Sequence, residues 1–232
     1  MSFFKCINKG KGPTKLFIGG VHGNEGKTAI GIFRYLIASD FSNGKNIIYN
    51  FDATPYISTL KEEYYSSAIG REIIAIIKRY KPDFYTELHC YNLKNYKKLT
   101  SPKRRENQGV PPLIELKNHV LISSVSPLIR KKYFKREAIC KTLEMPCLSE
   151  NEVNSYKSLK VTGVNKNSSN SYFDNNYNEE LAIKTYLDIL KLIAKSKSRK
   201  EFEKEIIAIY PKQVEFAKSY AKEIFGENYP PF

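Results

Sequence analysis

The chain has 232 residues, of which 41% are hydrophobic and 27% charged, and its net charge is +14. This length suits one sizeable domain, and the composition excludes intrinsic disorder, a collagen-like chain and a coiled coil for the chain as a whole. No apolar run approaches the roughly 20 residues that span a bilayer, and the first residues lack the apolar stretch of a secretory signal. We therefore expect a soluble, cytoplasmic protein that does not enter a membrane.

Apolar segments with strand and helix periodicity alternate along the chain. The pattern predicts strands at 15–20, 46–50, 83–89, 119–126 and 141–147, and helices at 27–37, 62–80, 178–196, 199–210 and 211–225. The last helix carries Val214, Ala217, Ala221, Ile224 and Phe225 on one face. Between the regular elements, the length of the polar, basic connection 91–117 suggests a binding loop or a mobile segment.

This alternation predicts the α/β fold class. We expect an open, mixed or largely parallel sheet with helices on both faces, followed by a helical C-terminal part. The whole chain, 1–232, is predicted to be one domain. Within it, residues 1–150 would hold the functional core, and residues 151–232 would form a loop and a helical extension.

The positive charge has two explanations. Most cations are lysines, and Asn, Ile and Tyr are plentiful, which is the mixture that an AT-rich genome produces; we favour this explanation. Basic segments at 97–98, 103–105 and 195–200 support the alternative of a non-enzymatic protein that binds nucleic acid or another polyanion. The oligomeric state is not predicted.

The four cysteines are expected to be reduced. Cys6, Cys90, Cys140 and Cys147 contain no Cys-x-x-Cys pair, and four cysteines in a chain of this length do not indicate a disulfide framework.

The segment 19–28, Gly-Gly-Val-His-Gly-Asn-Glu-Gly-Lys-Thr, joins the first predicted strand to the first predicted helix. Its end, Gly26-Lys27-Thr28, is similar to the end of a phosphate-binding loop. That pattern requires a glycine at position 21, where this chain has Val21, and the geometry of such a loop depends on the count. A nucleotide-binding loop is therefore the weaker interpretation of this segment.

A metal site is the stronger interpretation. His22 and Glu25 are three residues apart at the start of a helix, so their side chains lie on one turn. His89 closes the third predicted strand, and open α/β sheets place ligands beyond the carboxyl ends of such strands. Two histidines and a glutamate are a recognised ligand set for catalytic Zn²⁺. Glu87 shares a strand face with His89 and is expected to orient its imidazole.

The motif Gly-Gly-Val-His-Gly-Asn-Glu resembles the opening metal motif of the succinylglutamate desuccinylase/aspartoacylase family, a branch of the zinc carboxypeptidase superfamily. Glu87-Leu88-His89 is similar to the family's Asp-Leu-His segment, with Glu in place of Asp. Leu143-Glu144-Met145-Pro146 is similar to its Leu-Glu-Val-Gly segment, which holds a catalytic glutamate. The resemblance covers roughly residues 13–150 and is greatest to an uncharacterised methanogen branch.

The resemblance implies a zinc-dependent hydrolase of an amide bond, either a deacylase or a carboxypeptidase-like enzyme. It implies that Glu144 is the proton-transferring base. Glu150 and Glu152, which lie past the same predicted strand, are lower-ranked candidates for that role. The family's substrate-binding Asn-Arg pair has no clear counterpart, and Lys61 and Arg71 are the basic candidates for that role. A small anionic amide or peptide is the substrate that the resemblance implies.

Overall fold

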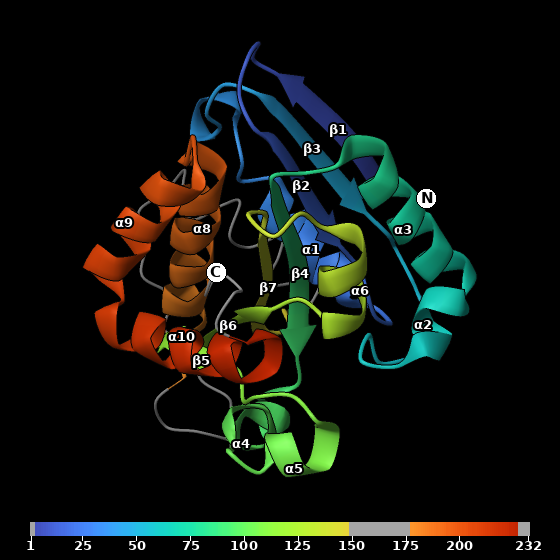
Figure 1. Cartoon of the computed structure of the whole chain (residues 1–232), viewed down its shortest axis with the longest axis vertical. Coiled ribbons are helices and arrows are strands. Elements are labelled where there is room, and N and C mark those ends of the chain that lie inside the picture. The colour runs from blue at the N-terminus through green and yellow to red at the C-terminus, as the bar shows by residue number, and fades with distance from the viewer. Residues whose placement is uncertain (1–2, 149–176, 227–232) are drawn as a thin grey trace.

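The computed structural model describes residues 3–148 and 177–226, and its centre is one seven-stranded sheet (Figure 1). The strands are β1 (Phe3–Asn8), β2 (Thr14–Gly19), β3 (Lys45–Asn50), β4 (Phe84–Tyr91), β5 (Ile114–Lys117), β6 (Val120–Ser124) and β7 (Ile139–Pro146). Their order across the sheet is β1-β3-β2-β4-β7-β6-β5. The pairs β3–β2, β2–β4 and β4–β7 are parallel, and the outer pairs are antiparallel. The prediction of an open, mixed sheet is confirmed.

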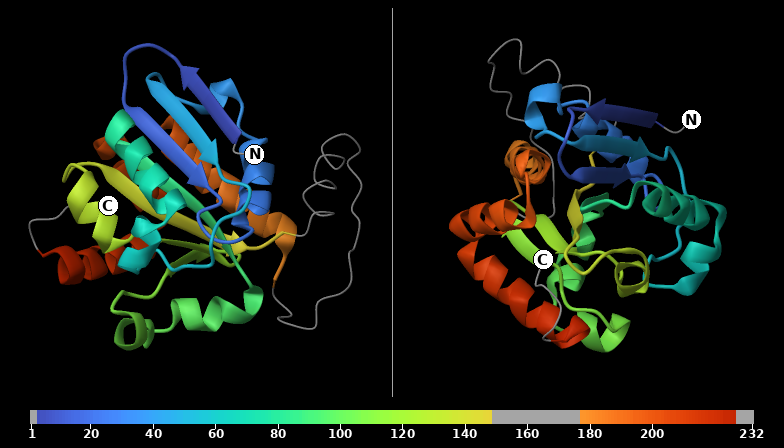
Figure 2. Two further views of the ribbon diagram at one scale, coloured as in Figure 1. Left: turned by 90° about the vertical axis from the view of Figure 1, so that its right-hand side faces the viewer. Right: turned by 45° about the horizontal axis from the view of Figure 1, so that its top comes forward.

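Helices cover both faces of this sheet (Figures 1 and 2). One face packs against α1 (Glu25–Phe33), α8 (Glu179–Lys195), α9 (Arg199–Ile209) and α10 (Pro211–Phe225). The other face packs against α2 (Glu62–Ser66), α3 (Ala68–Tyr80) and α6 (Pro127–Tyr133). Successive strand residues point to opposite faces, so in β2 Phe17 enters the first core, and Leu16 and Ile18 enter the second. The strands therefore read as continuous apolar runs.

Short helices fill the connections. They are η1 (Ala38–Asp40), η2 (Leu93–Asn95), α4 (Tyr96–Thr100) and α5 (Arg104–Gln108). The connection 91–117 is thus more regular than the sequence pattern predicts, and it ends in the edge strand β5. Within the described residues, no helix combines the length and apolar character that a bilayer crossing requires.

The predicted helix 62–80 is divided in two. Ser67 has an extended backbone, with ψ of 165°, and separates α2 from α3. Its hydroxyl accepts a hydrogen bond from the Gly70 N–H at 3.1 Å, which caps the start of α3. Apolar periodicity continues across the break, so the periodicity alone does not reveal it.

The expectation of four reduced cysteines is wrong for one pair. Cys90 and Cys147 form a disulfide, whereas Cys6 and Cys140 are free thiols. The parallel register of β4 and β7 brings the two Cα atoms of the pair to 4.8 Å, within the range that a disulfide requires. Local sequence contains no sign that β4 and β7 are neighbours, because some 50 residues separate them in the chain.

Lys15 is a fully buried cation on β2. Its ammonium donates to the Ser42 hydroxyl at 2.7 Å and to the Ala194 carbonyl, and it lies 5.2 Å from the centroid of the Phe84 ring. Burial lowers its pKa from 10.5 to about 7, although Glu201 acts in the opposite direction. The folded protein therefore releases this proton at a lower pH than the unfolded chain.

We predict that this lysine makes stability rise with pH above about 7. Between the folded pKa of about 7 and the unfolded pKa, the unfolded chain binds the extra proton, so the free energy of unfolding increases with pH in that window. Lys15→Met should flatten the rise, which thermal midpoints measured from pH 7 to 9.5 will show. Lys78→Met, at an exposed position of α3, is the control. Parallel pH profiles for wild type and Lys15→Met would contradict the prediction.

Candidate metal centre

The turn from β2 into α1 supplies His22 and Glu25. The His22 N–H donates to Glu25 Oε2 at 2.9 Å, and the Glu25 N–H donates to the His22 carbonyl at 3.0 Å. The carboxylate thus satisfies a backbone N–H at the start of the helix, as a capping glutamate does. The same contacts hold His22 Nδ1 at 3.4 Å from Glu25 Oε1.

Glycines let this turn approach the end of β3. A Cβ atom at Gly20 or Gly26 would overlap the carbonyl oxygen of Phe51, and Gly20 also has a φ of +72°. The steric demands of the turn therefore account for these two glycines without a phosphate ligand. The Thr28 hydroxyl is buried and accepts the Leu148 N–H at 3.2 Å. These contacts favour the metal interpretation of the segment over the phosphate-loop interpretation.

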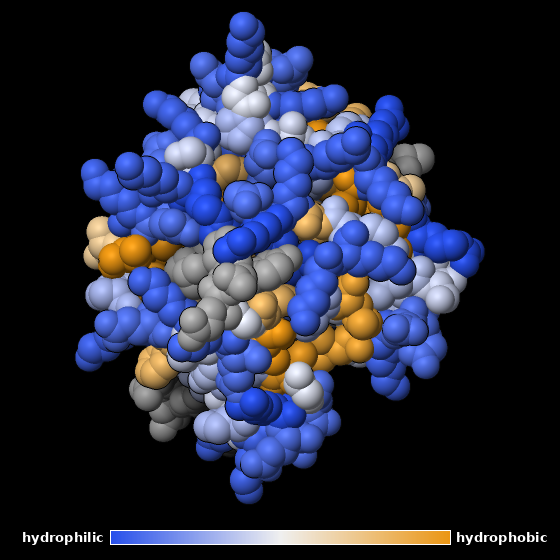
Figure 3. Space-filling view, viewed as in Figure 1, coloured by the Kyte–Doolittle hydropathy of each residue, from blue (hydrophilic) through white to orange (hydrophobic). Residues whose placement is uncertain are grey.

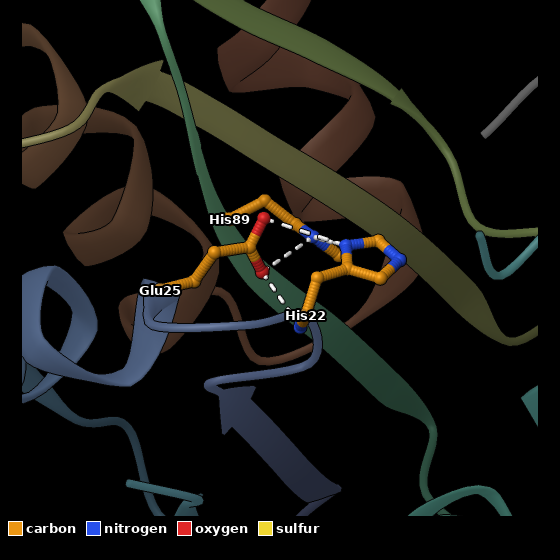
Figure 4. A group of neighbouring side chains, drawn as sticks. All are labelled: His22, Glu25 and His89. Atoms are coloured by element: carbon orange, nitrogen blue, oxygen red, sulfur yellow. Dashed lines mark hydrogen bonds and ion pairs between the residues drawn. The ribbon is translucent and has the colours of Figure 1, made fainter. Parts of the chain in front are cut away.

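The end of β4 brings His89 to the same point. Its Nδ1 lies 3.1 Å from Glu25 Oε2 and 3.2 Å from His22 Nδ1. Figure 4 shows the two imidazoles and the carboxylate directed toward one another, and their ligand atoms all lie within 4.8 Å of each other. Tetrahedral ligands at zinc distances are roughly 3.3–3.6 Å apart, so small adjustments would place all three around one ion.

Glu87 lies behind His89, where the sequence predicts an orienting group. His89 Nε2 is 3.3 Å from Glu87 Oε2, which leaves Nδ1 directed at Glu25 and His22. The Tyr85 hydroxyl donates to Glu87 Oε1 at 2.9 Å, and the Thr142 hydroxyl donates to Oε2 at 3.3 Å. A carboxylate behind a ligating imidazole fixes the ring and its tautomer, so this arrangement fits a metal ligand.

The charges around the cluster favour a cation at its centre. Burial opposes ionisation of Glu25, but the neighbouring His89 and His22 outweigh it and lower the pKa of this carboxyl to about 2. Burial would also lower the pKa of His89, yet Glu25 and Glu87 raise it well above its usual value. The site therefore combines an ionised carboxylate with imidazoles held in a negative field, and its N₂O donor set is one that zinc accepts.

Glu144 lies next to the cluster. On β7 it is directly opposite His89 in the parallel register, and its side chain is half-buried. Burial raises the pKa of Glu144, and Glu25 adds to this, whereas His89 and Arg104 act in the opposite direction. The rival bases Glu150 and Glu152 lie outside the described residues.

Arg104 is a residue of this site that the sequence reasoning did not single out. It begins α5, and its guanidinium donates to Gln108 Oε1 at 3.1 Å and to the Pro111 carbonyl. Burial lowers its pKa, and the negative charge of Glu144 opposes this. The only sequence signal is the run 103–105, which does not reveal which of three adjacent cations faces inward.

The two basic candidates from the sequence lie in different places. Lys61 is exposed at the start of α2, two residues beyond Thr59, whose N–H donates to His22 Nε2 at 3.3 Å. Arg71 is exposed on α3, and its guanidinium donates to the Ser66 carbonyl. Lys61 is therefore the better placed of the two, and the substrate role of both stays a prediction.

Three comparisons place the chain among known proteins. Residues 10–226 match the family described as "Uncharacterized protein conserved in archaea (DUF2119)". In an alignment of 225 residues that covers 93% of each chain, this chain is 41% identical to the uncharacterized protein MJ0501 of Methanocaldococcus jannaschii.

Among solved structures, the chain is similar to an aspartoacylase family protein from Mesorhizobium loti, at 16% identity and a TM-score of 0.33. That match covers 75% of this chain and 59% of the other. A likeness of this size leaves the function to be argued from the side chains, and membership of the aspartoacylase family stays a prediction. The family match and the archaeal relative show that the chain belongs to the DUF2119 family of archaeal proteins.

Proposed function

We propose that this protein is a zinc-dependent hydrolase of an amide bond, either a deacylase or a carboxypeptidase-like enzyme. The observation that carries the proposal is the convergence of His22, Glu25 and His89, with Glu144 opposite His89 on the adjacent strand. Three protein ligands leave a coordination position open, which distinguishes catalytic zinc sites from structural ones. The resemblance of the His22 motif to that of aspartoacylases supports the same reaction class.

The chain's own residues have separable tasks in this reaction. Zinc held there would lower the pKa of a water molecule and polarise the scissile carbonyl. Glu144 accepts the proton of the attacking water and returns it to the leaving amine. Its raised pKa suits this exchange, because a base works best when its pKa approaches the working pH. Glu87 keeps His89 in the ligating orientation.

The cations around the centre support an anionic substrate. Lys61 follows the segment that contacts His22, and the charge of Arg104 acts on Glu144. Either could receive a substrate carboxylate through a charge-assisted hydrogen bond. A small anionic amide or peptide therefore remains the partner that we propose, and a polyanion such as nucleic acid is the alternative.

Hydrolysis by zinc-loaded protein tests the proposed function. The enzyme, loaded with one equivalent of zinc, should release amine from N-acyl amino acids, and a chelator should abolish the release. Zinc added after the chelator is removed should restore it. Nucleic acid binding that is tighter than substrate binding and unaffected by the chelator, without hydrolysis of any N-acyl amino acid, would favour the alternative function.

We predict that Lys61, rather than Arg71, contributes to carboxylate binding. Lys61→Ala should raise KM for an N-acyl amino acid roughly tenfold, the usual weight of a hydrogen bond to a charged group, and should change KM little for its carboxamide. Arg71→Ala, which removes an equal charge from the next helix, is the matched control. Equal increases for both variants and both substrates would instead indicate a diffuse effect of the +14 charge.

A further inference from the structure

An apolar groove lies on the surface between α10, α6 and α5. Apolar side chains gather in a hollow in the lower middle of Figure 3, over these elements. One wall is the face of α10 that carries Val214, Ala217, Ala221 and Ile224. Only Val214 in this face is buried, and the other three are half-exposed. An amphipathic helix thus leaves part of its apolar stripe facing the groove.

Two lining residues link the groove to the surroundings of the metal centre. His22, Glu25 and His89 do not line it, but Leu60 and Arg104 do. Leu60 follows Thr59, the residue whose N–H contacts His22 Nε2. The charge of Arg104 acts on Glu144, which is opposite His89 on the adjacent strand. A molecule that lies along the groove with one end at Arg104 therefore has that end on the side nearest to the metal centre.

The charges in the groove have one sign. Arg104, Arg130 and Lys141 line it, and no Asp or Glu occurs among its described lining residues. The Arg130 guanidinium is committed to the carbonyls of Lys135, Arg136 and Ala138, so it stays fixed in the wall. Arg104 is the cation at the rim. An apolar groove with a cation at one end complements an apolar chain with a carboxylate at one end.

We propose that this groove binds the acyl chain of the substrate, an unbranched apolar chain whose carbonyl end lies between Arg104 and the metal centre. This inference rests on the proposed function and adds a substrate class to it: an amide with a long acyl group, whose hydrolysis releases a fatty acid. The groove extends from α5 to Ile206 on α9, so an acetyl group would leave most of it unfilled. A short acyl group would also leave the apolar stripe of α10 in water.

Fluorescence provides a binding test that needs no turnover. The chain has no tryptophan, so Tyr220→Trp places a single reporter in the groove, and Ser219→Trp places one on the exposed side of the same helix. Dodecanoate should shift the emission of Tyr220→Trp to the blue and leave Ser219→Trp unchanged. Each methylene should tighten binding about fourfold, so hexanoate, which is six methylenes shorter, should bind more weakly by roughly a thousandfold or more. Arg104→Gln should weaken the binding of dodecanoate but not of dodecanol.

Kinetics test whether the groove serves the reaction. The kcat/KM for N-dodecanoylglycine should exceed that for N-acetylglycine at least about tenfold. Ala221→Glu places a carboxylate in the groove and should reduce this ratio, whereas Ser219→Glu adds the same charge outside and should keep it. Ala217→Phe fills the groove without adding a charge and should reduce the same ratio. It replaces Ala221→Glu in the experiment if that variant does not fold.

Three results would overturn the inference. The first is an emission of Tyr220→Trp that dodecanoate does not change, and the second is a kcat/KM that does not depend on chain length. The third is a blue shift that grows with protein concentration alone, because a second copy of the chain would then occupy the groove. Binding of dodecanoate, together with no hydrolysis of any N-acyl amino acid by the zinc-loaded protein, would reject the proposed function and leave the groove as a site for apolar carboxylates.

Discussion

His89→Ala should reduce the zinc content of the protein from about one ion per chain to less than about a tenth. The substitution removes one of three protein ligands and leaves the carboxylates of Glu25 and Glu87 without the imidazole that lies between them. Two remaining ligands do not hold zinc as a catalytic site does. Elemental analysis after reconstitution with zinc and extensive dialysis measures the effect, and hydrolysis should fall with it.

His119→Asn is the matched control for this experiment. His119 lies at the turn between β5 and β6 with a φ of +62°, a conformation that Asn tolerates, and its ring packs against Tyr96. The His119→Asn variant should retain zinc at the wild-type level. Circular dichroism of both variants shows whether they fold. Full zinc content in folded His89→Ala, or a wild-type protein that stays metal-free after reconstitution, would contradict the site.

Glu144→Gln should lower kcat by about 10²–10⁴ while zinc content stays at the wild-type level. Glutamine keeps the size of the side chain and removes its ability to accept and return a proton. The Glu144 side chain is not one of the three metal ligands, which are His22, Glu25 and His89, so the metal should remain. Single-turnover rates with a saturating N-acyl amino acid, measured beside zinc content, separate proton transfer from metal binding.

The rival carboxylates provide the comparison for this variant. Glu150→Gln and Glu152→Gln remove the same charge a few residues further along the chain. If either of them abolishes turnover while Glu144→Gln remains active, then the base is the other carboxylate. Turnover that none of the three affects would exclude a glutamate base from this segment.

The residues of the metal cluster can be predicted largely from local sequence patterns. His22 and Glu25 are joined by one turn, and His89 stands at the end of a predicted strand. Parallel strands end at the same edge of a sheet, so His22 and His89 come together when β2 and β4 are parallel and adjacent, which they are. The approach of Glu87 to the far nitrogen of His89 follows in the same way from strand periodicity.

Features that depend on distant packing were not predictable. The inward direction of Arg104 goes with its hydrogen bond to the Pro111 carbonyl, and three adjacent cations share the same local pattern. The break at Ser67 requires a serine side chain to cap the next helix, a contact that apolar periodicity does not record. The sequence pattern also does not reveal the edge strand β1, because all six of its side chains are exposed or only partly buried and form no long apolar run.

The disulfide between Cys90 and Cys147 makes a covalent ring of the chain between them, a separation of 57 residues. Arg104 and Glu144 lie inside this ring, whereas His22, Glu25 and His89 all precede it. A protease that cuts at the exposed residues Lys97 and Lys98 would open the ring without dividing the molecule. The strand that carries Glu144 would stay tethered beside the strand that carries His89, and a thiol reductant under denaturing conditions would then separate the two fragments.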